Sequence, residues 1–277
     1  MNLDLGKRVD EQLRRVSSRV TKNIALRAGD HYDMYLGSGY PKSGTSWLCQ
    51  LMGHYLDAPH PQNYSSPIAM RAVLHNHWLH DDRFPPSVYI IRDGRDVMVS
   101  LYFYMVRAVQ QPRHPRQAAR LKTRFDQIFP AGYDLDDIES NLPAFIRAEH
   151  EDPIAFRGTS WTDHVRSWCE VPHANVTTTR YEDLLASPTR EFTRIMTDLL
   201  KQEADPRKVE QSVARYDFGT SGRKAGVEDR TSFMRKGVSG DWRNHFTAES
   251  ATVLHEFAGS MLTTLGYEDD PEWADKL

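Results

Sequence analysis

Residues 39–47 constrain the fold of this 277-residue chain more than any other stretch. Their sequence, GYPKSGTSW, places two glycines and a lysine between the short apolar run at residues 34–36 and a helix-like run at residues 48–52. Strand, glycine loop and helix in this order form the phosphate site of many α/β proteins, because the loop N–H groups and the positive helix end both face the anion. The stretch therefore predicts an α/β fold with an anion site.

The position of Lys42 decides which kind of phosphate loop this is. An ATP-type loop reads G-x-x-x-x-G-K-[ST], with the lysine directly after the second glycine. Gly39 and Gly44 have that spacing, but Thr45 follows Gly44 and the lysine lies two residues before it. The sequence predicts a phosphate loop that differs from the ATP type. An ordinary turn with a surface lysine is the alternative.

Composition limits the class of protein. The length suits one α/β domain, and a formal net charge of -3 gives no basic field for nucleic acid. Two cysteines, Cys49 and Cys169, are too few for a disulfide framework. The chain has no run of about 18 apolar residues and no signal-peptide core, so we expect a cytoplasmic protein without a transmembrane segment.

Residues 1–28 predict an amphipathic helix, because apolar residues recur at helical spacing with cations around them. The apolar positions are Leu5, Val9, Leu13, Val16, Val20 and Ile24, and the cations are Arg14, Arg15, Arg19 and Lys22. Such a helix more often packs on its own domain, and we expect that here. A helix lying on a membrane surface is the alternative.

Three histidines, His75, His77 and His80, lie within six positions. If residues 71–78 form a strand, His75 and His77 share one face. Imidazole is a common metal ligand, and Asp81 and Asp82 are close in sequence, but no cysteine or carboxylate completes a clear set, so we expect no metal. His77 lies between the phosphate loop and the next motif, where a neutral imidazole could accept a proton from a substrate hydroxyl. A structural histidine is the alternative.

The next motif, residues 88–100, predicts a buried parallel strand followed by a helix. Asp93 is placed as the helix N-cap, with Asp96 three residues later in a box-like pattern. Arg92 lies at the carboxyl end of the strand, where open α/β sheets bind ligands, and Ser100 lies two turns into the helix. Two interpretations stay open: Arg92 and Ser100 face one anion, or Arg92 pairs with Asp96 for structural reasons.

Three stretches carry a family resemblance. Residues 40–47 (YPKSGTSW) and 92–100 (RDGRDVMVS) resemble the two nucleotide motifs of the cytosolic-type sulfotransferases. Residues 233–247 (FMRKGVSGDWRNHFT) are similar to the carboxy-terminal signature of that family, and shorter matches lie at residues 160–165 and 181–184. The resemblance implies one domain over residues 1–277 with a three-layer, P-loop-like α/β fold, in which helices flank a mostly parallel central sheet.

The same resemblance implies a donor, 3′-phosphoadenosine 5′-phosphosulfate (PAPS), a product, 3′-phosphoadenosine 5′-phosphate (PAP), and a hydroxyl or amine of a small molecule as acceptor. By position, the resemblance implies that the 5′-phosphosulfate is bound by Lys42, Ser43, Gly44, Thr45 and Ser46. The adenine would be bound by Trp47, Tyr181 and Phe218. The 3′-phosphate would be bound by Arg92, Ser100, Arg235, Lys236 and Gly237. His77 matches the catalytic base of the family. Lys42 would stabilise the leaving phosphate oxygen, and the scheme requires no metal.

Two departures from the family pattern have consequences. Many family members have lysine-threonine-histidine at the base, whereas this chain has His75, Asn76 and His77. Either His75 replaces the second lysine, which would make activity sensitive to pH near neutrality, or Lys42 acts alone. The dimer-forming motif of the family is also altered, since Arg243, Thr247, Ala248 and Thr252 stand in its place, so the family's mode of dimerisation is not expected.

Residues 105–160 are expected to form the acceptor site and its lid, because loops on a fixed scaffold usually carry specificity. Further along, residues 176–179 predict a strand, and residues 189–200, 207–215 and 249–265 predict helices.

Two other functions stay open. A kinase-like phosphotransferase is disfavoured by the lysine offset and the lack of a clear Mg²⁺ carboxylate. A catalytically idle PAP-binding protein is permitted by His75.

Overall fold

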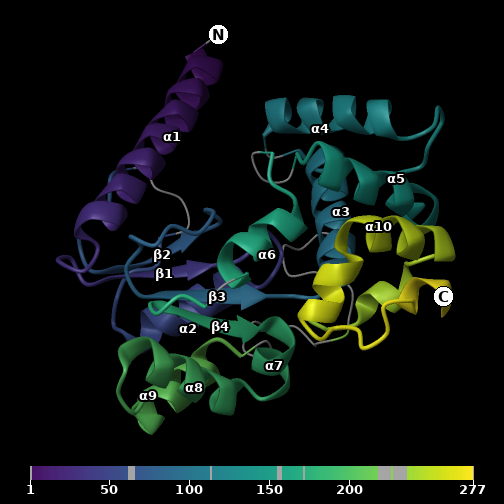
Figure 1. Cartoon of the computed structure of the whole chain (residues 1–277). Helices are drawn as coiled ribbons and strands as arrows, with labels where there is room; N and C mark the ends of the chain where they lie inside the picture. Colours follow the sequence, from purple (N-terminus) through teal and green to yellow (C-terminus); the bar gives the residue numbers. More distant parts are fainter. Residues whose placement is uncertain are drawn as a thin grey trace. The chain divides into compact units, whose positions relative to one another are not determined.

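The computed structural model describes residues 2–61, 66–112, 114–154, 158–170, 172–217, 226 and 236–276 (Figure 1). The chain divides into two compact units. Met1–Ile91 and Ser167–Ser221 form the first unit, and Arg92–Arg166 and Gly222–Leu277 form the second. The single domain expected over residues 1–277 stays a prediction.

The first unit holds a four-stranded parallel sheet in the order β2-β1-β3-β4. Its strands are β1 (Met34–Ser38), β2 (Ala72–Asn76), β3 (Ser87–Ile91) and β4 (Val176–Arg180). Every residue of β3 is buried, as the apolar run predicted for a parallel strand. The parallel α/β sheet is thus confirmed. The strand expected over residues 71–78 is shorter, and His77 lies beyond its end.

Helices cover both faces of this sheet. The helices of the first unit are α1 (Asn2–Ala28), α2 (Thr45–Tyr55), α7 (Tyr181–Ala186), α8 (Pro188–Leu200) and α9 (Pro206–Arg215). On one face, Val88 and Ile90 join a core with residues of α2 and α8. Tyr89 points to the other face, because successive strand residues alternate, and stacks on Trp168 of α6 (Trp161–Cys169) with ring centroids 5.0 Å apart. This confirms a parallel sheet flanked by helices.

Helix α1 packs through a face that its apolar pattern did not predict. Ser17, Thr21 and Ala25 are buried, and the backbone N–H of Ile68 donates to Thr21 Oγ1 at 3.0 Å. The apolar side chains of Val9, Leu13, Val16 and Val20 are exposed instead. The helix thus packs on its own unit, as expected, and it does so through small side chains, while these four apolar residues stay outside the contact. Within the described ranges, no helix combines the length and the apolar character needed to span a bilayer.

The described part of the second unit is built from helices. They are α3 (Gly94–Gln110), α4 (Pro115–Ile128), α5 (Ile138–Glu151), α10 (Ala248–Thr264) and two short 3₁₀ helices, η2 (Asp241–Asn244) and η3 (Trp273–Lys276). The first part of α6, up to Arg166, also belongs to this unit, and its last residues belong to the first. α3 packs on α4 and α5, and α10 packs on α5. The role of residues 105–160 as acceptor site and lid stays a prediction. Gly266, at φ 67°, follows Leu265, the C-cap of α10.

The start of α3 confirms one half of its predicted cap. The side chain of Asp93 accepts a hydrogen bond from the Arg95 backbone N–H, as an N-cap should. Asp96 does not complete the box. Its carboxylate instead accepts from the backbone N–H groups of Gly240 at 2.7 Å and Trp242 at 2.9 Å. These partners lie far along the sequence, so local spacing could not reveal them.

Candidate functional site

The loop between β1 and α2 has a backbone that requires its two glycines. A Cβ atom on Gly39 would lie 2.7 Å from the Ile90 carbonyl oxygen. Gly44 has a φ of 96°, and a Cβ there would lie 2.7 Å from the Tyr181 ring. Lys42 also has a positive φ, 74°, which is uncommon for a residue with a side chain. Residues held in such conformations concentrate at ligand-binding sites.

Two hydroxyls in this loop suit an anion. Ser43 and Thr45 are 1 % and 3 % exposed. Among the residues that the structure describes, neither Ser43 Oγ nor Thr45 Oγ1 has a hydrogen-bond partner. Buried hydroxyls are normally partnered, and these two lie at the N-terminus of α2, which no side chain caps. The donor set therefore fits a phosphate or sulfate group.

His77 is held in a defined tautomer by the same loop. Its Nδ1 lies 2.6 Å from the Gly39 carbonyl oxygen, which can only accept a hydrogen bond, so Nδ1 carries the proton. In the neutral ring, Nε2 is then the basic nitrogen. Burial lowers the pKa of His77, the bond to Gly39 raises it, and the Lys42 ammonium lowers it further. The net pKa lies below the ordinary value, so the ring is neutral at pH 7.

His75 does not supply a second positive charge. Burial, followed by the neighbouring His77 and His60, lowers the pKa of His75 to about 3. Its ring stands edge-on to that of His77, with centroids 5.1 Å apart. The side chain is therefore uncharged at pH 7. Of the two interpretations of the missing lysine, this favours Lys42 acting alone.

Two aromatic residues border the phosphate loop. Trp47 Nε1 donates to the Tyr216 carbonyl oxygen at 3.0 Å, which fixes the indole ring. Tyr181, the first residue of α7, stands edge-on to Trp47 at 6.2 Å between centroids. The structure thus brings Trp47, Tyr181 and Gly44 together, as the resemblance implied. Phe218, the third residue assigned to the adenine, lies outside the described residues.

These groups all follow carboxyl ends of parallel strands. The phosphate loop follows β1, His77 follows β2 and Tyr181 follows β4. Arg92 comes directly after the last residue of β3. Open α/β sheets bind their ligands at this edge.

In the second unit, Arg92 is joined to the carboxy-terminal signature. Its Nη2 donates to the Val238 carbonyl oxygen at 3.0 Å and lies 3.7 Å from Asp96 Oδ2. Because Asp96 accepts shorter bonds from Gly240 and Trp242, the ion pair with Arg92 is its longer contact. Both interpretations of Arg92 therefore keep support, and the guanidinium lies beside the segment that contains Gly237.

The remaining residues assigned to the 3′-phosphate differ in their surroundings. Gly237, at φ 63°, and Gly240, at φ 79°, turn the chain after Lys236. Lys236 Nζ lies 2.5 Å from Asp241 Oδ1, so its charge is already balanced. Ser100 is half-buried on α3. Arg235 lies outside the described residues.

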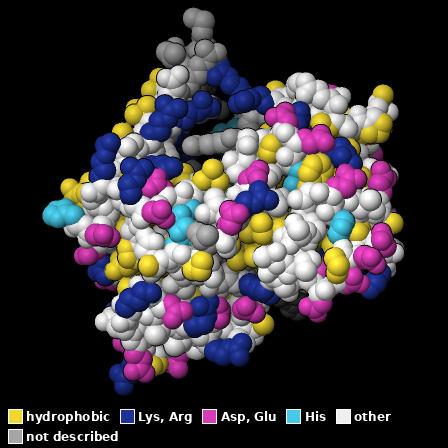
Figure 2. Space-filling model, in the orientation of Figure 1, with side chains coloured by type: hydrophobic (Ala, Val, Ile, Leu, Met, Phe, Trp, Pro, Cys, Tyr) yellow, Lys and Arg dark blue, Asp and Glu magenta, His cyan; other side chains and the backbone are white. Residues whose placement is uncertain are grey.

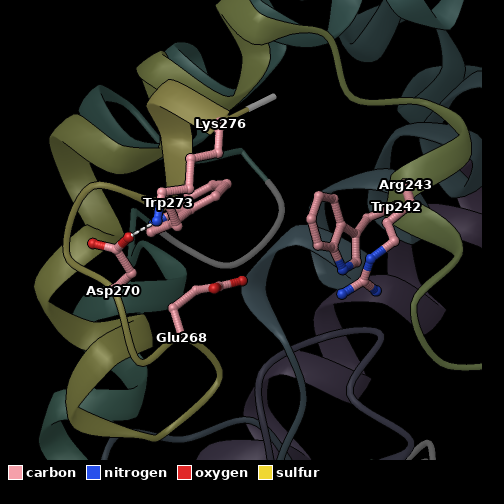
Figure 3. A pocket seen from close by; sticks show the side chains of 6 residues that line it. All are labelled: Trp242, Arg243, Glu268, Asp270, Trp273 and Lys276. Carbon is pink, nitrogen blue, oxygen red and sulfur yellow. Dashed lines mark hydrogen bonds and ion pairs between the residues drawn. The ribbon is translucent and has the colours of Figure 1, made fainter.

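Sequence reasoning missed the role of Arg95. The Arg95 side chain is 2 % exposed and donates hydrogen bonds to both carboxylate oxygens of Asp93. It also forms an ion pair with Glu268, and its Cζ atom lies 4.0 Å from the centroid of the Trp242 ring. The close Asp93–Arg95 spacing is a weak sequence signal for it. A pocket of about 390 Å³ lies beside this cluster (Figure 3). It is lined by Trp242, Arg243, Glu268, Asp270, Trp273 and Lys276.

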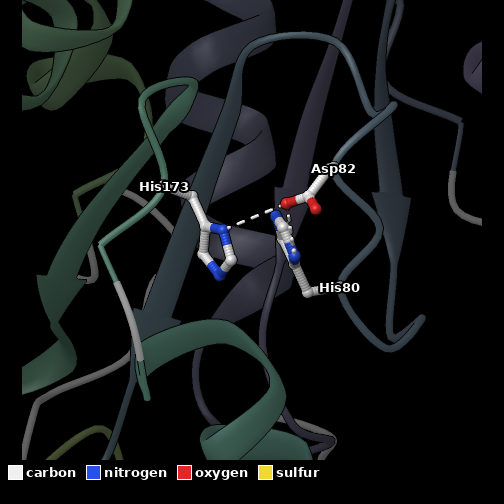
Figure 4. Close-up of side chains that lie close together, drawn as sticks. All are labelled: His80, Asp82 and His173. Carbon is white, nitrogen blue, oxygen red and sulfur yellow. Dashed lines mark ion pairs between the residues drawn. The ribbon is translucent and has the colours of Figure 1, made fainter.

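One group of described side chains has distances that suit a metal ion, and it shares only His80 with the three histidines of residues 75–80. His173 Nδ1 and His80 Nδ1 lie 3.2 and 3.8 Å from Asp82 Oδ1 (Figure 4). The two imidazoles are stacked, with centroids 3.6 Å apart and planes 27° apart. Lone pairs in nearly parallel rings do not converge on one ion. The absence of a metal requirement stays a prediction.

Comparison with known proteins identifies the family. The model for the Sulfotransferase domain matches residues 86–266, more than half of the chain. Sulfotransferase 1C2 of Rattus norvegicus is 26 % identical over 75 % of this chain and 76 % of its own. Sulfotransferase 1A1 of Canis lupus familiaris is 27 % identical over 83 % of each.

Two solved structures share the fold. Mouse sulfotransferase SULT7A1 complexed with PAP aligns with a TM-score of 0.59 and 22 % identity, over 88 % of this chain and 90 % of that chain. Retinol dehydratase in complex with androsterone and inactive cofactor PAP aligns with a TM-score of 0.54 and 16 % identity, over 83 % of this chain and 80 % of that chain. These alignments confirm the predicted P-loop-like fold. With the domain match, they show that this chain belongs to the sulfotransferase domain family, as its three motifs predicted.

Proposed function

We propose that this sulfotransferase moves a sulfuryl group from PAPS to a hydroxyl or amine of a small-molecule acceptor. Family membership supports the reaction type. The glycine loop with its two buried hydroxyls supports a phosphosulfate ligand. PAP, the product of that donor, is bound in the two structural relatives.

In the proposed reaction, the acceptor oxygen attacks sulfur in line with the bond to the leaving phosphate. A new S–O bond forms, the old S–O bond breaks, and PAP leaves with the bonding electrons. The acceptor proton passes to Nε2 of His77. The observation that carries this assignment is the 2.6 Å contact between His77 Nδ1 and the Gly39 carbonyl oxygen, because it leaves Nε2 as the basic nitrogen.

Lys42 takes the complementary role in this proposal. Negative charge builds up on the leaving phosphate oxygen, and an ammonium group placed there stabilises it without donating a nucleophile. Lys42 is close enough to His77 to lower the pKa of the imidazole. Ser43, Gly44, Thr45 and Ser46 complete the proposed phosphosulfate ligands.

The rest of the nucleotide is assigned to two further groups of residues. Trp47, Tyr181 and Phe218 are proposed to hold the adenine. The 3′-phosphate is assigned to Arg92, Ser100, Arg235, Lys236 and Gly237. The bond from Arg92 to Val238 supports this second group, because it holds a permanent cation next to Gly237.

The substitution His77→Ala tests the assignment of the base. We expect turnover with PAPS to fall by about 10²–10⁴-fold, the usual contribution of a general base. PAP affinity, measured by titration calorimetry, should change by less than about threefold, since the base contacts the acceptor side. His80→Ala is the matched control, because it removes a nearby imidazole that is not proposed to act.

Loss of PAP binding in His77→Ala would make His77 a structural residue. Unchanged turnover would remove it from the mechanism. Tight PAP binding by the wild type, without product from any acceptor, would indicate the idle nucleotide-binding protein instead. Magnesium-dependent turnover of ATP would indicate a phosphotransferase.

A further inference from the structure

Helix α1 carries an apolar stripe that nothing in its unit covers among the described residues. Val9, Leu13, Val16 and Val20 are 51 %, 53 %, 55 % and 38 % exposed. Their spacings of four, three and four residues place them on one helix face. Single exposed apolar residues are ordinary, but a contiguous row of them marks an interaction site.

The same helix is strongly basic. Residues 2–28 contain seven cations and three acids; all three acids lie before residue 12, and residues 12–28 contain five of the cations, whereas the whole chain has a formal net charge of -3. These five cations are Arg14, Arg15, Arg19, Lys22 and Arg27, and the four arginines are exposed. Figure 2 shows Lys and Arg side chains gathered along α1. Arg27 lies seven residues after Val20, so it continues the stripe as a cation. The surface is therefore complementary to a partner that is both apolar and anionic.

We propose that α1 is a membrane-surface helix that binds bilayers with anionic headgroups. In this arrangement the stripe from Val9 to Val20 enters the boundary between headgroups and acyl chains, and the arginines contact lipid phosphates. The helix lies on the bilayer and does not cross it, in keeping with its charge. The proposal is independent of the chemistry assigned to His77 and Lys42.

A second copy of this chain fits the stripe less well. Val9, Leu13, Val16 and Val20 match the two apolar positions of a heptad for only two heptads, and coiled coils need about three or four. The next two positions of that pattern are Asn23 and Arg27. Pairing two copies would also bring two basic helices together, which is unfavourable.

Sedimentation of the full chain with lipid vesicles tests the proposal. Vesicles of phosphatidylcholine mixed with phosphatidylglycerol should bind the protein, vesicles of phosphatidylcholine alone should not, and added salt should weaken the binding. Leu13→Ser/Val16→Ser should abolish it. Arg19→Gln/Arg27→Gln should weaken it by about thirtyfold. These side chains are exposed, so circular dichroism should show an unchanged fold.

Two controls separate the helix from general stickiness. Leu79→Ser removes an apolar residue that is 42 % exposed outside α1, and Arg190→Gln/Arg207→Gln removes two exposed charges elsewhere. Both should bind vesicles like the wild type. The proposal is overturned if the protein binds neither kind of vesicle or binds neutral vesicles as well as anionic ones. It is also overturned if the control variants lose as much vesicle binding as the α1 variants. A dimer that Leu13→Ser/Val16→Ser converts to a monomer, without vesicle binding, would also overturn it.

Discussion

Replacing Arg92 tests whether its guanidinium binds the phosphate that distinguishes PAP from adenosine 5′-monophosphate. The guanidinium carries a permanent charge, and a charge-assisted hydrogen bond contributes about 1.5–3 kcal/mol. Arg92→Ala should therefore raise the dissociation constant of PAP by about 10–150-fold. Adenosine 5′-monophosphate lacks only the 3′-phosphate, so its affinity should change by less than about threefold. Titration calorimetry measures both ligands.

The structure adds one complication, which a second variant resolves. Arg92 also donates to the Val238 carbonyl oxygen at 3.0 Å, so Arg92→Ala removes a bond to the protein as well. Arg92→Gln keeps an N–H donor for Val238 but has no charge. If the phosphate contact dominates, Arg92→Gln should weaken PAP nearly as much as Arg92→Ala. Arg147→Ala, at a side chain 44 % exposed and paired with Glu256, is the control.

Equal losses for PAP and adenosine 5′-monophosphate would refute this reasoning, because Arg92 would then act on the fold or on the adenosine. Full PAP affinity in Arg92→Gln would assign the whole effect to the bond with Val238.

Three further predictions concern the phosphate loop and the base. Because the pKa of His77 is lowered and its neutral form accepts the proton, kcat/KM should be level above pH 7 and fall on the acid side. The midpoint of that fall should lie below 6.5, the ordinary value, in a pH–rate profile; a midpoint above it contradicts the assignment. His75→Lys should preserve or raise turnover at pH 7, since His75 is uncharged there. A collapse of the rate would show that this imidazole is needed. Gly44→Ala should lower the free energy of unfolding in urea by about 1–3 kcal/mol, because it combines a positive φ with a contact to Tyr181. Gly132 also has a positive φ, but a Cβ there would meet no atom, so Gly132→Ala should lower the free energy of unfolding by less. Equal decreases in the two variants would show that the contact with Tyr181 is unimportant.

Local signals in the sequence were enough to predict the loops, caps and strands that are contiguous in the chain. The glycine loop of residues 39–44 lies between β1 and α2 as expected, because its glycines and flanking apolar runs are close together. Asp93 caps α3 for the same reason. The parallel strand at residues 88–91 followed from its unbroken apolar run.

Contacts between segments that are distant in the chain could not be predicted from the sequence. Asp96 binds Gly240 and Trp242, more than 140 residues away, although its spacing from Asp93 indicated a local cap. Arg95 lies over Trp242, a pairing that no periodicity encodes. Helix α1 packs through small side chains such as Ser17, because small residues allow close approach, and apolar periodicity carries no signal for such a face. The charge state of His75 depends on its burial, which residue identity does not give.

Mass spectrometry of acceptor mixtures tests the proposed sulfuryl transfer most directly. The wild-type chain is incubated with PAPS and a set of hydroxylated small molecules, with His77→Ala as the matched sample. We predict that at least one acceptor gains the mass of one SO₃ group, that PAP accumulates in equal amount, and that His77→Ala forms neither product at a comparable rate. Intact PAPS and unmodified acceptors across a chemically broad set, in the presence of tight PAP binding, would contradict the account.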